Sequence, residues 1–218
     1  PVEQVRAMPR PGARHDKIAL PAELYPDRRN SAGIDLSNEQ ALAELVKGLK
    51  ESAQTDWVAR PTFGPGEEHA VLNPADHRDR VGTVFEFPAS EAGTAVRRAA
   101  ASGWGETPVE RRAAILESTA DAFQTRMPVL IGLAVREAGK SVPNAIAEVR
   151  EAIDFLRYYA AQIRANFGPE QQPLGPIVCI SPWNFPLAIF TGQVAAALAA
   201  GNPVLAKPAP STPLIAAE

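Results

Sequence analysis

Asn184 and Lys207 each follow a short apolar run that is predicted to be a β-strand, Ile177 to Ile180 and Val204 to Ala206. Neither run alternates with polar residues, which is typical of strands covered on both faces in a parallel sheet. The carboxyl ends of such strands lie at one edge, where ligands of open α/β sheets bind. An asparagine amide at that edge can stabilise negative charge on the oxygen of an attacked carbonyl group.

Each of these two residues also has an ordinary interpretation. Asparagine is among the best residues for capping a helix N-terminus, and an apolar helical stretch, Phe185 to Ala200, follows Asn184 directly. The first N–H groups of that helix would carry positive potential at the same place. Lys207 could be a solvated lysine at the end of a strand. The residues alone leave these alternatives open.

Cys179, the only cysteine of the chain, lies inside the first apolar run. Burial among apolar neighbours would raise the pKa of its thiol and leave it unreactive, so we interpret Cys179 as structural rather than nucleophilic. The three histidines, His15, His69 and His77, are scattered without the spacing of metal ligands. We therefore predict no metal site.

The two runs and the stretch between them predict a strand, a helix and a parallel strand joined by a right-handed crossover, with Gly201-Asn202 ending the helix. A hairpin and a helical layer are expected before this unit. The hairpin strands are expected near 70–74 and 81–87, and the helices from Ser37 to about Ala53, Ser90 to Ser102, Pro108 to about Thr125, Leu130 to Ala138 and Ser141 to just before Gly168.

Side-chain patterns give these helices their expected caps and faces. Ser37, with Gln40 three residues later, predicts a capping box for the first helix. The second helix is expected to turn Ala92, Ala95, Val96 and Ala99 inward, and the last has the strongest apolar face, formed by Ile146, Val149, Ile153, Leu156, Ala160 and Ile163.

The composition, 45% hydrophobic and 22% charged, is that of an ordinary soluble globular protein. The formal net charge of −3, together with the lack of a basic stripe with interleaved aromatic residues, argues against nucleic acid as a partner. No apolar run has membrane-spanning length. A single cysteine and the lack of a signal-peptide pattern predict a reducing cytoplasm.

Residues 1–66 are expected to form an inter-domain linker and a helix, followed by an α/β unit over 67–218. Pro1 to Arg14 mixes proline, arginine and glycine without periodicity, as a linker or tail does. Ile18 to Gly33 is rich in turns with isolated apolar residues, which predicts a segment laid over another domain's surface. Because Pro1 is no natural initiator and the chain stops just after a helix starts, we expect a piece of a longer protein.

Seven short motifs occur in a fixed order between residues 73 and 208. They are Asn73-Pro74-Ala75, Gly103-Trp104, Glu110 to Leu116, Glu137-Ala138-Gly139-Lys140, Ser181-Pro182-Trp183-Asn184-Phe185-Pro186, Ala200-Gly201-Asn202 and Lys207-Pro208. Each motif alone is weak, but the set in this order and spacing is very specific. Over roughly residues 71–218 the chain resembles the aldehyde dehydrogenases.

The resemblance implies an α/β fold with a partial Rossmann-like NAD-binding domain, preceded by helices and a linker. That family does not need the G-x-G-x-x-G fingerprint, which this chain lacks in its first strand-to-helix turn. The implied reaction is attack of a cysteine thiolate on an aldehyde, hydride transfer to NAD, and release of the acid by water that a glutamate guides.

Residues 18–38, 155–160 and 180–209 further resemble one branch, the bifunctional proline utilization A flavoenzymes. In that branch the dehydrogenase follows an FAD-dependent proline dehydrogenase domain of the same polypeptide. Its small-molecule aldehyde is L-glutamate γ-semialdehyde, in equilibrium with 1-pyrroline-5-carboxylate, and the product is glutamate. The full-length protein is then expected to be a homo-oligomer in the cytoplasm, with peripheral membrane association.

The resemblance assigns roles to individual residues of this chain. Asn184 would donate to the oxyanion, Lys207 would hydrogen-bond the adenosine ribose, and Glu151 and Phe185 would line the mouth and wall of the aldehyde pocket. Ile180, Ser181, Pro182 and Trp183 would pack beside the nicotinamide ribose and the pyrophosphate. Solvated or ordinary packing roles are the alternatives. Where the family normally has a second ribose ligand, a glutamate, this chain has Pro210, so the usual basis for preferring NAD over NADP is missing.

The family's nucleophilic cysteine and general-base glutamate would lie beyond Glu218, so these residues alone are expected to be inactive. Two other hypotheses remain at this point. One is an aldehyde-dehydrogenase-like domain that has lost catalysis and serves assembly; the other is a module that binds NAD by itself. The presence of Asn184 and Lys207 argues against a domain that has lost catalysis. A module that binds NAD by itself is disfavoured because half of the sheet and most of the nicotinamide contacts would be missing.

Overall fold

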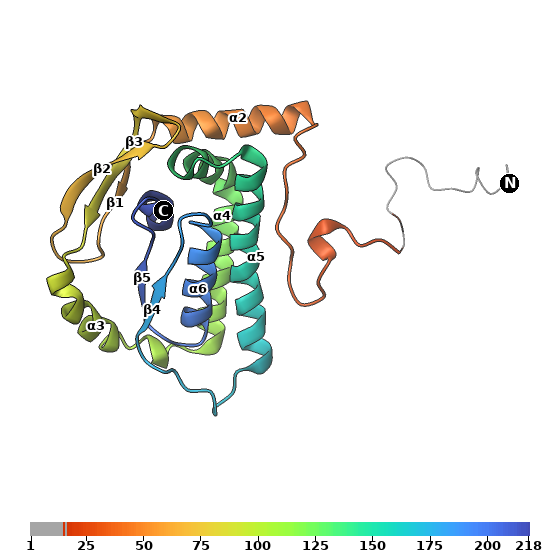
Figure 1. The fold of residues 1–218 in the computed structure, drawn as a ribbon. Coiled ribbons are helices and arrows are strands. Elements are labelled where there is room, and N and C mark those ends of the chain that lie inside the picture. Colours follow the sequence, from red (N-terminus) through yellow and green to blue (C-terminus); the bar gives the residue numbers. More distant parts are fainter. Residues whose placement is uncertain (1–14, 16) are drawn as a thin grey trace, which may run out of the picture.

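The computed structural model describes His15 and residues 17–218, so the linker expected over residues 1–14 lies outside the described residues. The chain alternates two helical regions with two small sheets (Figure 1). In order, the elements are η1 (Pro21–Glu23), α2 (Glu39–Gln54), β1 (Trp57–Ala59), β2 (Glu67–Asn73), β3 (Asp76–Glu86), η2 (Ala89–Glu91), α3 (Ala92–Ala100), η3 (Trp104–Glu106), α4 (Val109–Ala138), α5 (Val142–Asn166), β4 (Ile177–Ile180), α6 (Ala188–Ala199), β5 (Val204–Lys207) and α7 (Pro213–Ala217).

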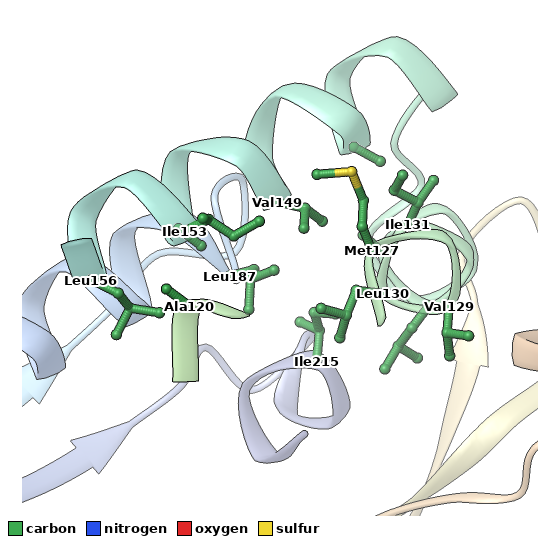
Figure 2. Close-up of a cluster of buried hydrophobic side chains, with 14 of the residues drawn as sticks. Ala120, Met127, Val129, Leu130, Ile131, Val149, Ile153, Leu156, Leu187 and Ile215 are labelled. Atoms are coloured by element: carbon green, nitrogen blue, oxygen red, sulfur yellow. The ribbon is translucent and has the colours of Figure 1, made fainter. Parts of the chain in front are cut away.

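The long helices α4 and α5 lie side by side and form the centre of the structure, with α6 packed against them (Figure 1). Gly139 ends α4 in the left-handed conformation that favours glycine, which lets the chain reverse directly into α5. Apolar side chains from both helices meet Leu187 and Ile215 in one buried cluster (Figure 2). This core therefore fixes the segments that enter α6 and form α7.

A single helix, α4, replaces the two helices expected over Pro108 to Thr125 and Leu130 to Ala138, so that division was wrong. Pro128 lacks a backbone N–H and normally kinks or ends a helix. Here its neighbours Met127 and Val129 are buried, and α2 packs against it through Gly48, where any added Cβ would collide with the Pro128 side chain. Tertiary packing thus outweighs the local preference.

Strands β4 and β5 are parallel, pairing Ile177 with Val204 and Ile180 with Lys207, and α6 connects them. The predicted strand–helix–strand unit is confirmed, although α6 begins at Ala188 rather than at Phe185. The expected cover on both faces was wrong for these residues, since Val178 is 57% and Ile180 63% exposed.

The other sheet has the order β1-β3-β2 and contains the predicted hairpin of β2 and β3. Strand β1, too short to be predicted, pairs in parallel with β3 and places Trp57 opposite Gly82. A Cβ at Gly82 would collide with the Trp57 carbonyl oxygen, so the approach requires glycine. This pairing joins residues on both sides of the expected boundary at residue 66.

Two local expectations for the helices were also wrong. The N-cap of α2 is Asn38, not Ser37, and its side chain accepts hydrogen bonds from the N–H groups of Gln40 and Ala41. The inward face expected for α3 is not buried: the helix has no buried residue, and Val96 is exposed.

The segment around Ser31 crosses the outer face of α5 (Figure 1). The backbone N–H and the hydroxyl of Ser31 each donate to the Asp154 carboxylate at 2.7 Å. Next to it, the Ala32 N–H donates to the Gln124 side chain of α4 at 2.8 Å. A surface-laid segment was expected here, and the surface it covers is the helical layer of the same chain.

Replacing Asp154 with alanine in the full-length protein is expected to loosen this segment. A hydrogen bond to a charged group contributes roughly 1.5–3 kcal/mol, so the free energy of local opening should fall by about that amount. Hydrogen exchange of the peptide holding Ser31 should become faster. Glu117→Ala breaks an ion pair between α4 and Arg164 of α5 but removes no contact of the Ser31 segment, so it should leave that exchange unchanged. Equal protection in Asp154→Ala and the native protein would contradict the importance of the Asp154 contact.

Candidate coenzyme and aldehyde site

The turn between β4 and α6 lies beside the carboxyl end of β5. The backbone N–H of Ser181, the first residue of the turn, donates to the Lys207 carbonyl at 3.2 Å. Ile180 is the strand partner of Lys207. The structure therefore confirms that the turn carrying Asn184 and the residue Lys207 share one edge of the sheet.

Asn184 is exposed in this turn and has no hydrogen-bond partner among the described residues. The alternative that it caps the following helix is wrong: the N-cap of α6 is Leu187, and no side chain at that position caps the helix. Its exposed neighbours are Trp183, at 60%, and Phe185, at 40%. The amide of Asn184 is thus free to donate to a ligand.

At the start of α6, where the sequence predicts positive potential, two backbone N–H groups are bonded to a buried carboxylate. One oxygen of Glu148, on α5, accepts hydrogen bonds from the N–H groups of Leu187 at 2.8 Å and Ala188 at 3.3 Å. Its other oxygen lies 2.6 Å from the ammonium group of Lys140. These N–H groups therefore do not contribute an open anion site.

Lys140 connects this carboxylate to the aromatic part of the turn. Its Nζ lies 4.7 Å from the centre of the Phe185 ring, within the range of a cation–π contact. The side chain is only 12% exposed, so the charge is shielded from water by the ring, Glu148 and the surrounding helices.

Helix α7 is held by a second buried carboxylate in a similar way. The two oxygens of Glu137, at the end of α4, accept from the N–H groups of Leu214 at 2.6 Å and Ile215 at 2.8 Å. Burial raises the pKa of Glu137 to about 7, although the two N–H groups act in the opposite direction.

The sequence motif that contains Glu137 and Lys140 gives no role to either residue, and none is predicted from the sequence for Glu148. A signal for Glu148 was present. It lies on the same helical face as Ala145, Val149 and Ala152, all of which are buried. A carboxylate inside an apolar stripe requires a polar partner from another element.

Lys207 is exposed, and its ammonium group donates to the carbonyl of Pro208 at 3.0 Å. Two of its three protons remain for a ligand. Pro210 is exposed in the next turn and offers no side-chain acceptor. Ser181 is buried, Pro182 is half-buried and Trp183 is exposed.

Glu151 lies one turn along α5 from Glu148 and is exposed, with no partner among the described residues. This position suits both a pocket-mouth carboxylate and the solvated alternative. Cys179 is 5% exposed, and burial raises the pKa of its thiol, which confirms the structural interpretation.

A hollow of about 490 Å³ lies elsewhere, between α4 and the end of the chain, and is lined by Ile115, Phe123, Arg126 and Glu218 among others. None of the predicted site residues lines it. Among the described residues, no His, Cys, Asp and Glu side chains gather into a potential metal site. In the same part of the chain, no helix combines the length and apolarity needed to cross a bilayer.

The aldehyde dehydrogenase family model matches residues 62–218. The bifunctional protein PutA of Rhizobium meliloti is 64% identical over 225 residues, a match that covers 100% of this chain and 18% of that protein. The 1-pyrroline-5-carboxylate dehydrogenase of Anoxybacillus flavithermus is 40% identical over 198 residues, covering 83% of this chain and 38% of that enzyme. The chain thus spans well under half the length of these relatives.

A crystal structure of 1-pyrroline-5-carboxylate dehydrogenase from Thermus with bound NAD superposes with a TM-score of 0.79 at 30% identity, covering 89% of this chain and 42% of that one. Proline utilization A from Bdellovibrio bacteriovorus superposes with a TM-score of 0.81 at 29% identity, covering 91% of this chain and 23% of that one. The arrangement of helices and strands is therefore part of the aldehyde dehydrogenase fold. With a family model matched over most of its length, the chain belongs to the aldehyde dehydrogenase family.

Proposed function

We propose that this chain belongs to the NAD-dependent dehydrogenase region of a bifunctional proline-catabolic protein, which oxidises L-glutamate γ-semialdehyde to glutamate. The observation that carries the proposal is the shared sheet edge, where the turn that bears the free amide of Asn184 starts beside Lys207. The relatives named PutA and 1-pyrroline-5-carboxylate dehydrogenase support the substrate, and the Thermus structure with NAD supports the coenzyme.

Each residue at the edge has a proposed task. Asn184 donates its amide to the aldehyde oxygen as negative charge develops there. Lys207 donates to the adenosine ribose hydroxyls, while residues 180–183 pack beside the nicotinamide ribose and pyrophosphate. Phe185 forms part of the aldehyde pocket wall, and Glu151 lies at its mouth. NAD, when bound, supplies the hydride acceptor.

The reacting thiolate must come from outside these residues. Cys179 is the only cysteine, and it is buried in β4 with a raised pKa. We propose that the nucleophile and the general-base glutamate lie in the remaining part of the dehydrogenase, so that residues 1–218 alone do not turn over. The same polypeptide would carry the FAD-dependent proline dehydrogenase domain, and the whole protein would be a cytoplasmic, membrane-peripheral homo-oligomer.

The direct test measures NADH formation by the full-length protein with L-glutamate γ-semialdehyde. We expect turnover that requires both substrates, and none from the 218-residue chain. A full-length protein that binds its assembly partners but forms no NADH would instead support a non-catalytic assembly domain.

Lys207→Ala in the full-length protein is expected to weaken NAD binding roughly tenfold to a hundredfold, because one charged hydrogen-bonding group is lost. Calorimetry gives the Kd directly. Since the side chain is exposed, thermal stability should stay unchanged. Lys50→Ala, an exposed lysine on α2, is the matched control. An unaltered Kd in Lys207→Ala would remove Lys207 from the coenzyme site, and comparison with NADP tests the effect of Pro210.

A further inference from the structure

The turn that carries Asn184 is anchored at both ends by contacts of different kinds. At its start, the Ser181 N–H is bonded to the Lys207 carbonyl. At its end, the N–H groups of Leu187 and Ala188 are bonded to Glu148. Residues 183–185 between these anchors are exposed. The backbone position of Asn184 therefore depends on where the two anchors hold the chain.

The second anchor is the more elaborate of the two. The Leu187 side chain points into the buried cluster beside Ile153 and Ala120 (Figure 2). Leu187 is therefore held by side-chain packing as well as by the hydrogen bond from its N–H to Glu148. Glu148 itself is 1% exposed and cannot move toward solvent without breaking its contact with Lys140. Lys140 in turn lies over the Phe185 ring, next to Asn184 along the chain.

The charge of this arrangement also matters for an oxyanion close by. A buried carboxylate without a partner is strongly disfavoured and would repel negative charge that develops on an aldehyde oxygen bound by the Asn184 amide. The Lys140 ammonium, 2.6 Å away, balances that charge. The pair thus supplies a hydrogen-bond acceptor for α6 without leaving net negative charge beside the turn.

We propose that Glu148 and Lys140 are positioning residues that hold the Asn184 amide in place for the reacting aldehyde oxygen. This inference rests on the proposed function, in which Asn184 stabilises the oxyanion. Neither residue touches the substrate; both act through the turn. Their effect should appear in kcat rather than in the affinity for NAD.

A double-mutant cycle in the full-length protein tests this dependence. Glu148→Gln alone should lower kcat roughly tenfold or more, with the KM for NAD changed by less than about twofold. In the Asn184→Ala background, the same substitution should lower kcat by less than about twofold further, because the amide to be positioned is already absent. Effects that instead multiply would overturn the proposal.

Glu137→Gln is the matched control, since it also removes a buried carboxylate that accepts two helix N–H groups, but on α7. Any effect of Glu137→Gln on kcat should multiply with that of Asn184→Ala. If both glutamates couple to Asn184 equally, loss of a buried carboxylate alone is the cause and the specific role of Glu148 fails.

Substitutions of Lys140 test the same proposal independently, including in the case that the Glu148→Gln variant does not fold. Lys140→Met should reproduce the kcat loss and the coupling to Asn184, and Lys140→Arg, which keeps the charge, should restore most of the activity. Independently of turnover, hydrogen exchange of the peptide holding residues 181–190 should become faster in Glu148→Gln and Lys140→Met. Unchanged exchange in both would overturn the anchoring role.

The outcomes separate this inference from the function on which it rests. A native full-length protein that forms no NADH, or an Asn184→Ala variant with full kcat, would refute the proposed function or the oxyanion role. An active native protein with a slow Asn184→Ala variant, combined with multiplying effects of Glu148→Gln, would refute the positioning role alone.

Discussion

Asn184→Ala in the full-length protein is expected to lower kcat by about 10²–10³, the usual effect of removing one oxyanion donor, equivalent to about 2.7–4 kcal/mol of barrier. The affinity for NAD should remain unchanged, because the amide is proposed to interact with charge that develops only during the reaction. Steady-state kinetics with L-glutamate γ-semialdehyde gives kcat, and calorimetry gives the Kd of NAD.

The geometry gives Asn184 no structural role, so a change in kcat in Asn184→Ala can be assigned to the reaction itself. Asn184 is exposed, caps no helix and has no partner among the described residues, so its loss should leave the melting temperature unaltered. Asn166→Ala, another exposed asparagine at the end of α5, serves as the control and should keep full kcat. If Asn184→Ala also keeps full kcat, Asn184 does not stabilise the oxyanion.

The attachment of α7 is expected to weaken as the pH rises from about 4.5 to about 7. Glu137 has a pKa of about 7 in the folded chain against 4.5 when it is exposed. Between these values the folded state binds more protons than the open state, so the free energy of opening falls with rising pH. The shift corresponds to about 3 kcal/mol, fully present below pH 4.5 and lost as the pH passes 7.

Hydrogen exchange of the peptide holding Leu214 and Ile215, corrected for the intrinsic pH dependence of exchange, measures this opening. Glu137→Gln should show a nearly flat pH profile, because the neutral amide does not titrate in this range. Glu170→Gln, at an exposed position, should keep the native profile. The same pH slope in Glu137→Gln as in the native protein would show that another group is responsible.

The part of the site that could be predicted depends on local pattern. Two unalternating apolar runs around a helical stretch were enough to place Asn184 and Lys207 at one sheet edge, since parallel strands end at the same edge. The pattern also identified Cys179 as buried. The break predicted near Pro128 is absent because proline's local tendency to end a helix is outweighed by packing against Gly48 of α2.

The buried carboxylates could be predicted only in part. Periodicity places Glu148 on an apolar helical face, which predicts that its carboxylate needs a polar partner. That partner, the backbone N–H of Leu187, lies 39 residues away in the sequence. Glu137 likewise meets Leu214 across 77 residues. Such contacts depend on how whole helices pack, and a local pattern holds no information about them.

Glu137, Lys140 and Glu148 all lie within one short stretch around the reversal at Gly139, yet they hold the starts of two different helices, α6 and α7. The tip of the α4–α5 hairpin therefore provides the carboxylates that bind the first N–H groups of both α6 and α7. The backbone around Asn184 and the segment after Lys207 therefore both depend on the same hairpin tip for their attachment to the helical layer.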